Sequence, residues 1–147
     1  MKLKNRKITL RYGENPNQKA YLISSNRSIF DFQISGKKIS YNNIIDVDSG
    51  LKCLSEFSEP TSIIIKHTNP CGVASGKKIE DAFLKSYKSD TKSAFGGIIF
   101  LNRKVSPKLA KQINKNFYEM IVAIDYDREA LSILEKKKNL ILLKMPH

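Results

Sequence analysis

The chain has 147 residues, which is enough to bury one ordinary hydrophobic core and predicts one domain or one large piece of a domain. Its 26 Lys and Arg residues outnumber 14 Asp and Glu residues, and the formal net charge of +12 favours anionic partners such as phosphates, although no helix-turn-helix spacing or RNA-binding aromatic signature points to nucleic acid. Two cysteines without a CxxC pair, and no apolar run near the roughly 18 residues of a membrane span, argue against a disulfide framework and a membrane protein and favour a soluble, cytoplasmic protein.

The first forty residues combine short apolar runs with a polar loop. Residues 10–18 contain Gly, Pro and many hydrogen-bonding side chains, and they separate the apolar runs 8–10 and 20–24. Composition alone favours a solvated N-terminal connection for this loop. Residues 28–34 then alternate weakly between apolar and polar, as a half-buried strand does, and a turn follows.

From Asn43 onward, the spacing of apolar residues changes to that of a helix. The apolar stripe consists of Ile44, Val47, Leu51, Leu54 and Phe57. Asn42 or Asn43 is expected to cap the N-terminus of this helix, and Pro60 lies just beyond its end.

The next stretch contains the strongest candidate for a reaction centre. Ile63–Ile65 are three consecutive β-branched residues, which predict a strand buried on both faces. This strand brings Lys66 and His67 to its carboxyl end, and the Pro and Gly of residues 70–72 are expected to end the sheet there. Because ligands of open α/β sheets bind beyond the carboxyl ends of strands, the Lys-His pair is a candidate site.

The rest of the chain alternates between helices and strands. The pattern predicts helices over 79–87, 106–117 and 127–134, and strands over 98–101, 120–124 and 140–145. Such alternation indicates an α/β fold, with a mainly parallel sheet between helices. The adjacent glycines Gly96 and Gly97 at a strand entrance suit either a close approach to a ligand or a simple tight turn, and the sequence leaves both open.

Four segments of the chain carry motifs that occur together in one enzyme family. They are Leu10–Pro16 (LRYGENP), Ser40–Asn43 (SYNN) followed by Leu51, Ile65–Gly72 (IKHTNPCG) and Ser93–Ile99 (SAFGGII). In this order they resemble the transformylase region of the bifunctional purine biosynthesis proteins, which combine AICAR transformylase with IMP cyclohydrolase. The resemblance runs from about Leu10 to the end of the chain.

This resemblance implies a fold similar to cytidine deaminase, a three-layer α/β/α domain that is present twice in the transformylase. Residues 1–147 look like the first copy, and the cyclohydrolase domain and the second copy have no counterpart. The implied reaction transfers a formyl group from 10-formyltetrahydrofolate to AICAR, giving FAICAR, without a metal and in a homodimer. Because much of the folate site lies in the missing parts in this family, we expect little or no activity from the chain alone.

The resemblance also implies roles for two neighbouring residues. His67 matches the family's general base, which is needed because the amine of AICAR is a poor nucleophile, and an imidazole suits that task. Lys66 matches a cation that stabilises the tetrahedral oxyanion. Successive extended residues point to opposite faces of a sheet, so the strand must end or twist at this pair for both to reach one cleft.

The other matched residues are expected to bind the nucleotide. Arg11 and Tyr12 match the family's nucleotide-binding pair, and a guanidinium suits bidentate contact with a phosphate or carboxamide. The other candidate substrate-binding residues are Asn42, Asn43, Phe95, Gly96, Gly97 and Glu119.

One motif position departs from the family, and two other functions compete. Asn17 stands where the family has His, so an imidazole role there is lost.

A zinc deaminase has a similar fold, but it needs a second cysteine after Cys71 and a Glu two residues after His67, and the sequence has neither. The non-enzymatic alternative is a basic module that binds nucleotide or nucleic acid without turnover.

Overall fold

The computed structural model describes residues 5–145. Its strands are β1 (Arg6–Thr9), β2 (Tyr21–Ser24), β3 (Gln33–Ser35), β4 (Thr61–Lys66), β5 (Asn69–Ser75), β6 (Ile98–Leu101), β7 (Met120–Ala123) and β8 (Ile141–Lys144). Its helices are η1 (Ile29–Phe32), α1 (Tyr41–Leu54), α2 (Ile79–Ser89), α3 (Pro107–Ile113) and α4 (Arg128–Leu134). Within these residues, no helix has both the length and the apolar character needed to cross a membrane.

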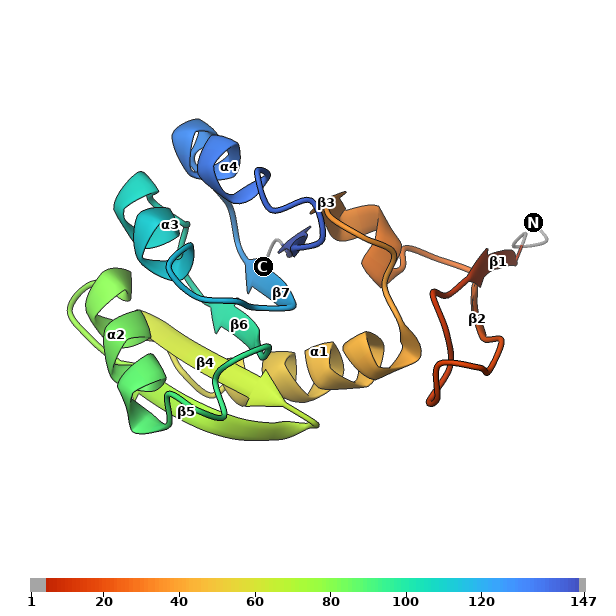
Figure 1. The fold of residues 1–147 in the computed structure, drawn as a ribbon, viewed down its shortest axis with the longest axis horizontal. Helices are drawn as coiled ribbons and strands as arrows, with labels where there is room; N and C mark the ends of the chain where they lie inside the picture. The colour runs from red at the N-terminus through yellow and green to blue at the C-terminus, as the bar shows by residue number, and fades with distance from the viewer. Residues whose placement is uncertain (1–4, 146–147) are drawn as a thin grey trace.

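A six-stranded sheet in the order β3-β8-β7-β6-β4-β5 lies between two layers of helices (Figure 1). Helices α2, α3 and α4 contribute to the apolar core on one face, and α1 contributes to the core on the other. Strand β4 supplies both cores, because Ile64 belongs to the first and Ile63 and Ile65 to the second. The predicted α/β fold with helices on both faces is confirmed.

The prediction of a mainly parallel sheet is wrong, because the sheet is mixed. Strands β6, β7 and β8 are parallel, whereas β4 is antiparallel to both β6 and β5, and β3 is antiparallel to β8. The error arose at residues 70–72, where Pro and Gly were expected to end the sheet. The chain instead reverses at His67 and Thr68 and returns as the edge strand β5, where a proline without an N–H is tolerated.

Close packing against α2 explains the glycine in β5. A Cβ atom at Gly72 would collide with the backbone carbonyl of Ser86 in α2. The residue therefore belongs to the interior of a strand that approaches a helix closely, and it does not mark a turn.

The N-terminal segment forms a separate two-stranded sheet, β1–β2, that extends from the main body (Figure 1). Backbone hydrogen bonds attach the loop between these two strands to the start of α1: Arg11 N–H donates to Ile39 O at 3.0 Å, and Tyr41 N–H donates to Tyr12 O at 3.1 Å. The strand expected over 28–34 is a short 3₁₀ helix followed by β3. The loop thus lies against the body and is not a free connection.

Helix α1 starts at Tyr41 and is capped by Ser40, not by Asn42 or Asn43 as expected. The Ser40 hydroxyl accepts the Asn43 N–H, and the Asn43 side chain accepts the Ser40 N–H, which together form a capping box. A hydroxyl at the N-cap satisfies an amide of the first turn, so the helix begins earlier than its apolar stripe indicates.

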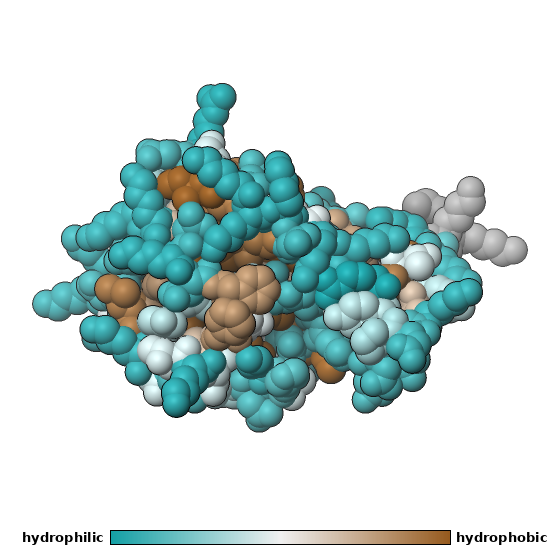
Figure 2. All heavy atoms as spheres, in the orientation of Figure 1, coloured by the Kyte–Doolittle hydropathy of each residue, from teal (hydrophilic) through white to brown (hydrophobic). Residues whose placement is uncertain are grey.

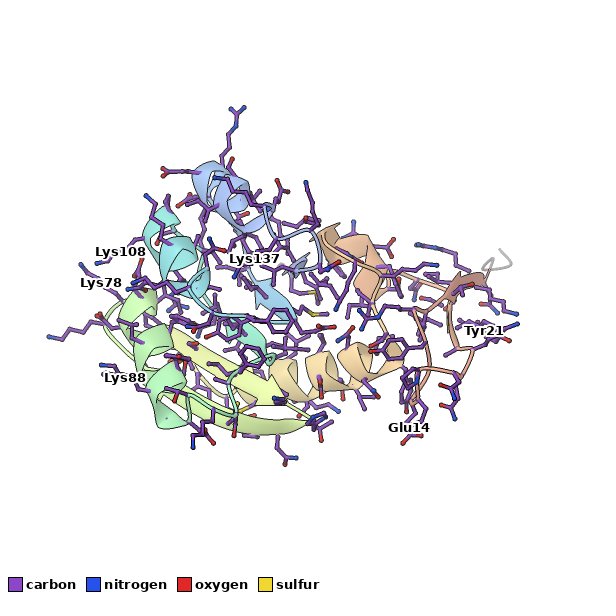
Figure 3. All side chains as sticks on the ribbon, viewed as in Figure 1. Glu14, Tyr21, Lys78, Lys88, Lys108 and Lys137 are labelled. Atoms are coloured by element: carbon purple, nitrogen blue, oxygen red, sulfur yellow. The ribbon has the colours of Figure 1, made fainter. Side chains whose placement is uncertain are left out.

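The charged residues are distributed widely over the surface. Hydrophilic residues cover most of the face shown in Figure 2, and apolar residues appear there in separate patches. Lys78, Lys88 and Lys108 lie on the side of α2 and α3, at the opposite end of the molecule from Glu14 and Tyr21 (Figure 3). These lysines are exposed to solvent on or beside helices that lie far from the N-terminal loop.

Candidate functional site

A cleft of about 160 Å³ opens where β4 ends and where β6 and β7 begin. Its lining combines the loop between β1 and β2, the N-cap and first turns of α1, the end of β4 and the entrances of β6 and β7. The lining residues are Tyr12, Ser40, Asn42, Asn43, Asp46, Ile65, Lys66, His67, Gly96, Ile98 and Glu119. Seven of the ten candidate residues from the sequence are therefore in this lining. The other three, Arg11, Phe95 and Gly97, are each adjacent in the sequence to a lining residue, either Tyr12 or Gly96.

A tight turn brings Lys66 and His67 to the same cleft. Strand β4 ends at Lys66, which pairs with Asn69 of β5, so His67 and Thr68 form a two-residue hairpin loop. Both have left-handed backbone conformations, with φ of 51° and 62°. Positive φ at both central residues is the signature of a type I′ turn. Because the strand ends at this pair, the two side chains need not point to opposite faces.

The two residues of the pair differ in their contacts. The Lys66 side chain is half-buried, and its Nζ donates to the backbone carbonyl of Phe95 at 2.8 Å. His67 is exposed, and within residues 5–145 its imidazole has no hydrogen-bond partner. The His67 imidazole is thus accessible from solvent, whereas the Lys66 ammonium is held by a hydrogen bond to the loop before β6.

The turn is tied to α1. Asp46 Oδ1 accepts the Thr68 N–H at 2.7 Å, and the Ser49 hydroxyl donates to Thr68 O at 2.8 Å. Burial raises the pKa of the Asp46 carboxyl, although the Thr68 N–H and the charge of His67 act in the opposite direction. Asp46 lines the cleft together with His67.

A second group of charges lies around Glu119. Its carboxylate accepts from Arg11 at 3.1 Å and from Lys37 at 2.9 Å, and its side chain is only 19% exposed. Burial acts to raise the pKa of Glu119, but the hydrogen bonds and charges of Lys37 and Arg11 outweigh it and lower this pKa. The Arg11 guanidinium also donates to the Tyr12 hydroxyl at 2.8 Å. The group holds two cations and one carboxylate, which leaves a net positive charge beside the cleft.

The double glycine packs against the end of β4. Gly96 has φ of 74° and its N–H donates to Phe117 O at 2.9 Å, while the Gly97 carbonyl accepts the Glu119 N–H at 3.0 Å. A Cβ on Gly97 would lie 3.0 Å from an Ile64 methyl group. Gly97 therefore allows close packing against β4, whereas Gly96 has the left-handed conformation that glycine adopts readily and lines the cleft.

The candidates Phe95, Asn42 and Asn43 differ in how much of each side chain is free to contact a ligand. Phe95 is 61% exposed, and the centroid of its ring lies 5.3 Å from that of the Phe117 ring. Asn43 is buried, and its side-chain oxygen is used by the cap of α1. Asn42 donates from its side chain to Glu14 O at 3.1 Å. Asn43 thus shapes the cleft from within the helix cap.

Sequence reasoning did not assign a role to two polar residues of the lining, Ser40 and Asp46, or to Lys37, which pairs with Glu119 beside the cleft. Asp46 could have been found, because it follows Asn42 and Asn43 at helical spacing and must share their face. Lys37 carried no signal, since its partner Glu119 is 82 residues away and Lys38 beside it is chemically identical. Within the described residues, no group of three or more His, Cys, Asp or Glu side chains gathers as metal ligands do.

The sequence matches known proteins over its whole length. The family model described as "AICARFT/IMPCHase bienzyme" matches residues 1–147. The chain is 48% identical over 147 residues to the "Bifunctional purine biosynthesis protein PurH" of Listeria monocytogenes serotype 4a (strain HCC23), and the match covers 97% of this chain and 29% of that protein. The protein of the same name from Staphylococcus epidermidis (strain ATCC 12228 / FDA PCI 1200) is 46% identical over 146 residues, which cover 97% of this chain and 30% of that protein. The chain thus spans less than a third of the length of these relatives.

The fold also has a solved counterpart. The apo structure of a dCMP deaminase from the cyanophage S-TIM5 aligns with a TM-score of 0.52 at 13% identity, over 69% of this chain and 97% of that one. This likeness confirms the expected deaminase-like fold. At such low identity it shows the fold alone.

Proposed function

Because the chain belongs to the AICARFT/IMPCHase bienzyme family, whose members are bifunctional enzymes of purine biosynthesis, we propose that it supplies the nucleotide side of an AICAR formyltransferase site. The observation that carries this proposal is the convergence of Lys66, His67 and the Glu119 charge group on one cleft. The cosubstrate would be 10-formyltetrahydrofolate, as the family's chemistry requires.

In the proposed reaction, the amine of AICAR attacks the formyl carbon of the folate. The lone pair of that amine is delocalised toward the carboxamide, so the attack needs a base to remove a proton as the new C–N bond forms. His67 is placed for this task, because its imidazole is accessible and has no competing hydrogen bond within residues 5–145. The imidazolium then returns the proton to the folate nitrogen as the old C–N bond breaks.

Lys66 would stabilise the tetrahedral intermediate. The formyl oxygen gains a full negative charge there, and a hydrogen-bonded cation is most useful where charge develops. An ammonium has three donors, so Lys66 can keep its bond to Phe95 O and donate another to the oxyanion.

The Arg11, Lys37 and Glu119 group would bind the nucleotide. Its net positive charge suits an anionic phosphate, and Glu119 holds the guanidinium in a fixed orientation. Gly96, which also lines the cleft, has no side chain and would let the ligand approach the backbone.

The relatives' extra length bears on the rest of the proposed site. We assign residues 1–147 to the first deaminase-like subdomain of the transformylase, and we assign the remaining folate contacts to parts found in the longer relatives and to a homodimer partner. On this reading the chain alone binds AICAR but transfers formyl groups poorly or not at all.

Binding tests the proposal directly. Calorimetry should give saturable binding of AICAR to the chain, weakened by about tenfold or more in Arg11→Ala because a charged hydrogen-bond donor is lost. Arg128→Ala, on the exposed side of α4, is the matched control and should bind as the unchanged chain does. Preference for single-stranded DNA with a steep salt dependence would instead support the basic binding module.

Turnover requires the longer protein. A chimera of the Listeria relative, with its matching segment replaced by this chain, should transfer formyl groups, and His67→Ala in the chimera should lower the rate by about 10²-fold to 10⁴-fold. Unchanged transfer in His67→Ala would remove His67 from the role of base.

A further inference from the structure

The turn that carries His67 is held in an uncommon conformation. His67 and Thr68 both have left-handed φ values, 51° and 62°, and neither is glycine. Threonine is β-branched and is especially disfavoured there. Such a turn persists only when the surrounding structure holds it in place, so the groups that hold it decide where the imidazole lies.

Two side chains of α1 hold this turn. Asp46 accepts the Thr68 N–H at 2.7 Å, and Ser49 donates to the Thr68 carbonyl at 2.8 Å. Asp46 and Ser49 are three residues apart, so they lie on the same face of the helix. Both backbone groups of Thr68 are therefore fixed by one rigid element.

Helix α1 is a firm support for these contacts. The capping box of Ser40 and Asn43 closes its N-terminus, and Val47 between the two anchors is only 4% exposed. Gly50 packs so tightly that a Cβ there would collide with the Phe100 ring. The position of α1 on the sheet is thus transmitted to the turn through Asp46.

Asp46 also contributes charge to the cleft. The other ionisable groups in the lining are Lys66 from β4, His67 from the turn, Glu119 before β7 and Tyr12 from the N-terminal loop. Within residues 5–145, Asp46 forms no ion pair; burial raises the pKa of its carboxyl, and the Thr68 N–H and the charge of His67 act to lower it. A carboxylate next to a base favours the imidazolium that forms when the base takes up a proton.

We propose that Asp46 is a positioning residue, whose carboxylate fixes the His67–Thr68 turn and stabilises the protonated imidazole without contacting substrate. This inference rests on the proposed function for the role of His67 as base. The hydrogen bond and the charge coupling are properties of the chain itself and can be measured without turnover.

The first test is amide hydrogen exchange at Thr68, measured by NMR on the chain. Asp46→Ala should speed exchange by about tenfold or more, because the amide loses its acceptor. Asp46→Asn keeps an oxygen acceptor and should change the rate by less than about threefold. Asp48→Asn, an exposed carboxylate on the same helix paired with Lys52, is the control and should have no effect. Unchanged exchange in Asp46→Ala would overturn the positioning role.

The second test is the carboxyl titration of Asp46, followed by carbon-13 NMR. Replacing His67 by Gln removes the cationic imidazolium, so the pKa of Asp46 should rise further above its ordinary value. Lys52→Gln is the matched control for loss of a positive charge on the surface. An Asp46 titration identical in His67→Gln and the unchanged chain would overturn the charge coupling.

The third test uses the chimera with the Listeria relative. Asp46→Ala should lower kcat by about tenfold or more with the KM for AICAR within about threefold, and Asp46→Asn should retain intermediate activity. Full activity in Asp46→Ala would overturn the inference and leave the proposed function standing. Absence of formyl transfer in the chimera without substitutions would overturn the proposed function, and the two NMR tests would then decide the role of Asp46 alone.

Discussion

The two walls of the cleft differ in whether their ionisable side chains form ion pairs. On one wall, Glu119 of the lining is joined to Arg11 and Lys37 behind it by ion pairs of 3.1 and 2.9 Å. On the other wall, Lys66 and His67 form no ion pair within residues 5–145, and Lys66 donates only to a backbone carbonyl. We call these the paired wall and the unpaired wall.

This difference indicates a division of labour. Side chains that are fixed by opposite charges are well suited to bind and orient a substrate, because little of their freedom remains to be lost. A cation and an imidazole that form no ion pair can direct their interactions to charge that appears during the reaction. We therefore expect changes in the unpaired wall to alter rate and changes in the paired wall to alter stability and affinity.

Next to the loss of His67, the largest effect is expected from Lys66→Met in the chimera with the Listeria relative. The rate of formyl transfer should fall by about 10²-fold to 10³-fold, because the oxyanion loses its cationic donor. Binding of AICAR should change much less. Lys52→Met, an exposed lysine of α1, serves as the control in the same assay. A variant with weakened AICAR binding and an unchanged kcat would place Lys66 with the binding residues and break the comparison.

A smaller effect is expected from Glu119→Gln in the paired wall. Loss of this half-buried carboxylate leaves Arg11 and Lys37 close together without compensation, so the free energy of unfolding should fall by about 1–3 kcal/mol at neutral pH. Urea unfolding measures this change. Glu129→Gln removes the partner of Lys111 in a pair that is 66% and 65% exposed, and it should have little effect.

The pH dependence of Glu119→Gln gives a sharper form of the same test. The pKa of Glu119 is lowered in the folded state, so its stabilising contribution is present above the ordinary carboxyl value of 4.5 and is lost as the pH falls through the folded value. The stability difference between the unchanged chain and Glu119→Gln should therefore shrink below about pH 4.5. A difference that stays constant with pH would show that the carboxylate charge is not the cause.

Much of the fold could be predicted because burial leaves a pattern in the sequence. Ile63–Ile65 predicted β4 correctly, and the helix expected over 106–117 is present as α3, which ends earlier, at Ile113. Strand β5 was missed because Pro70 and Gly72 have the composition of a turn, whereas the packing of α2 on Gly72 decides the structure. Local propensity was overridden there by a contact distant in the sequence.

The candidate site could be predicted only in part, for a related reason. Lys66 and His67 are adjacent in the sequence, so a pattern can find them, but the left-handed turn that brings them together has neither the Asn nor the Gly that usually mark it. Lys37 joins Glu119 across 82 residues, and no spacing rule reaches that far. Contacts of this kind are fixed by the packed fold, not by local composition.

The smallest effect is expected from Thr68→Gly in the turn of the unpaired wall. Glycine adopts positive φ without the steric cost that threonine bears at 62°, so the free energy of unfolding should rise by about 0.5–1 kcal/mol. Thr68→Ala is the matched control, because both variants lose the hydroxyl bond to His67 O but alanine keeps the Cβ that causes the strain. The difference between the two in urea unfolding isolates the left-handed conformation. If Thr68→Gly were no more stable than Thr68→Ala, the turn would carry no backbone strain. The contacts of Asp46 and Ser49 would then not be needed to keep Thr68 in its left-handed conformation.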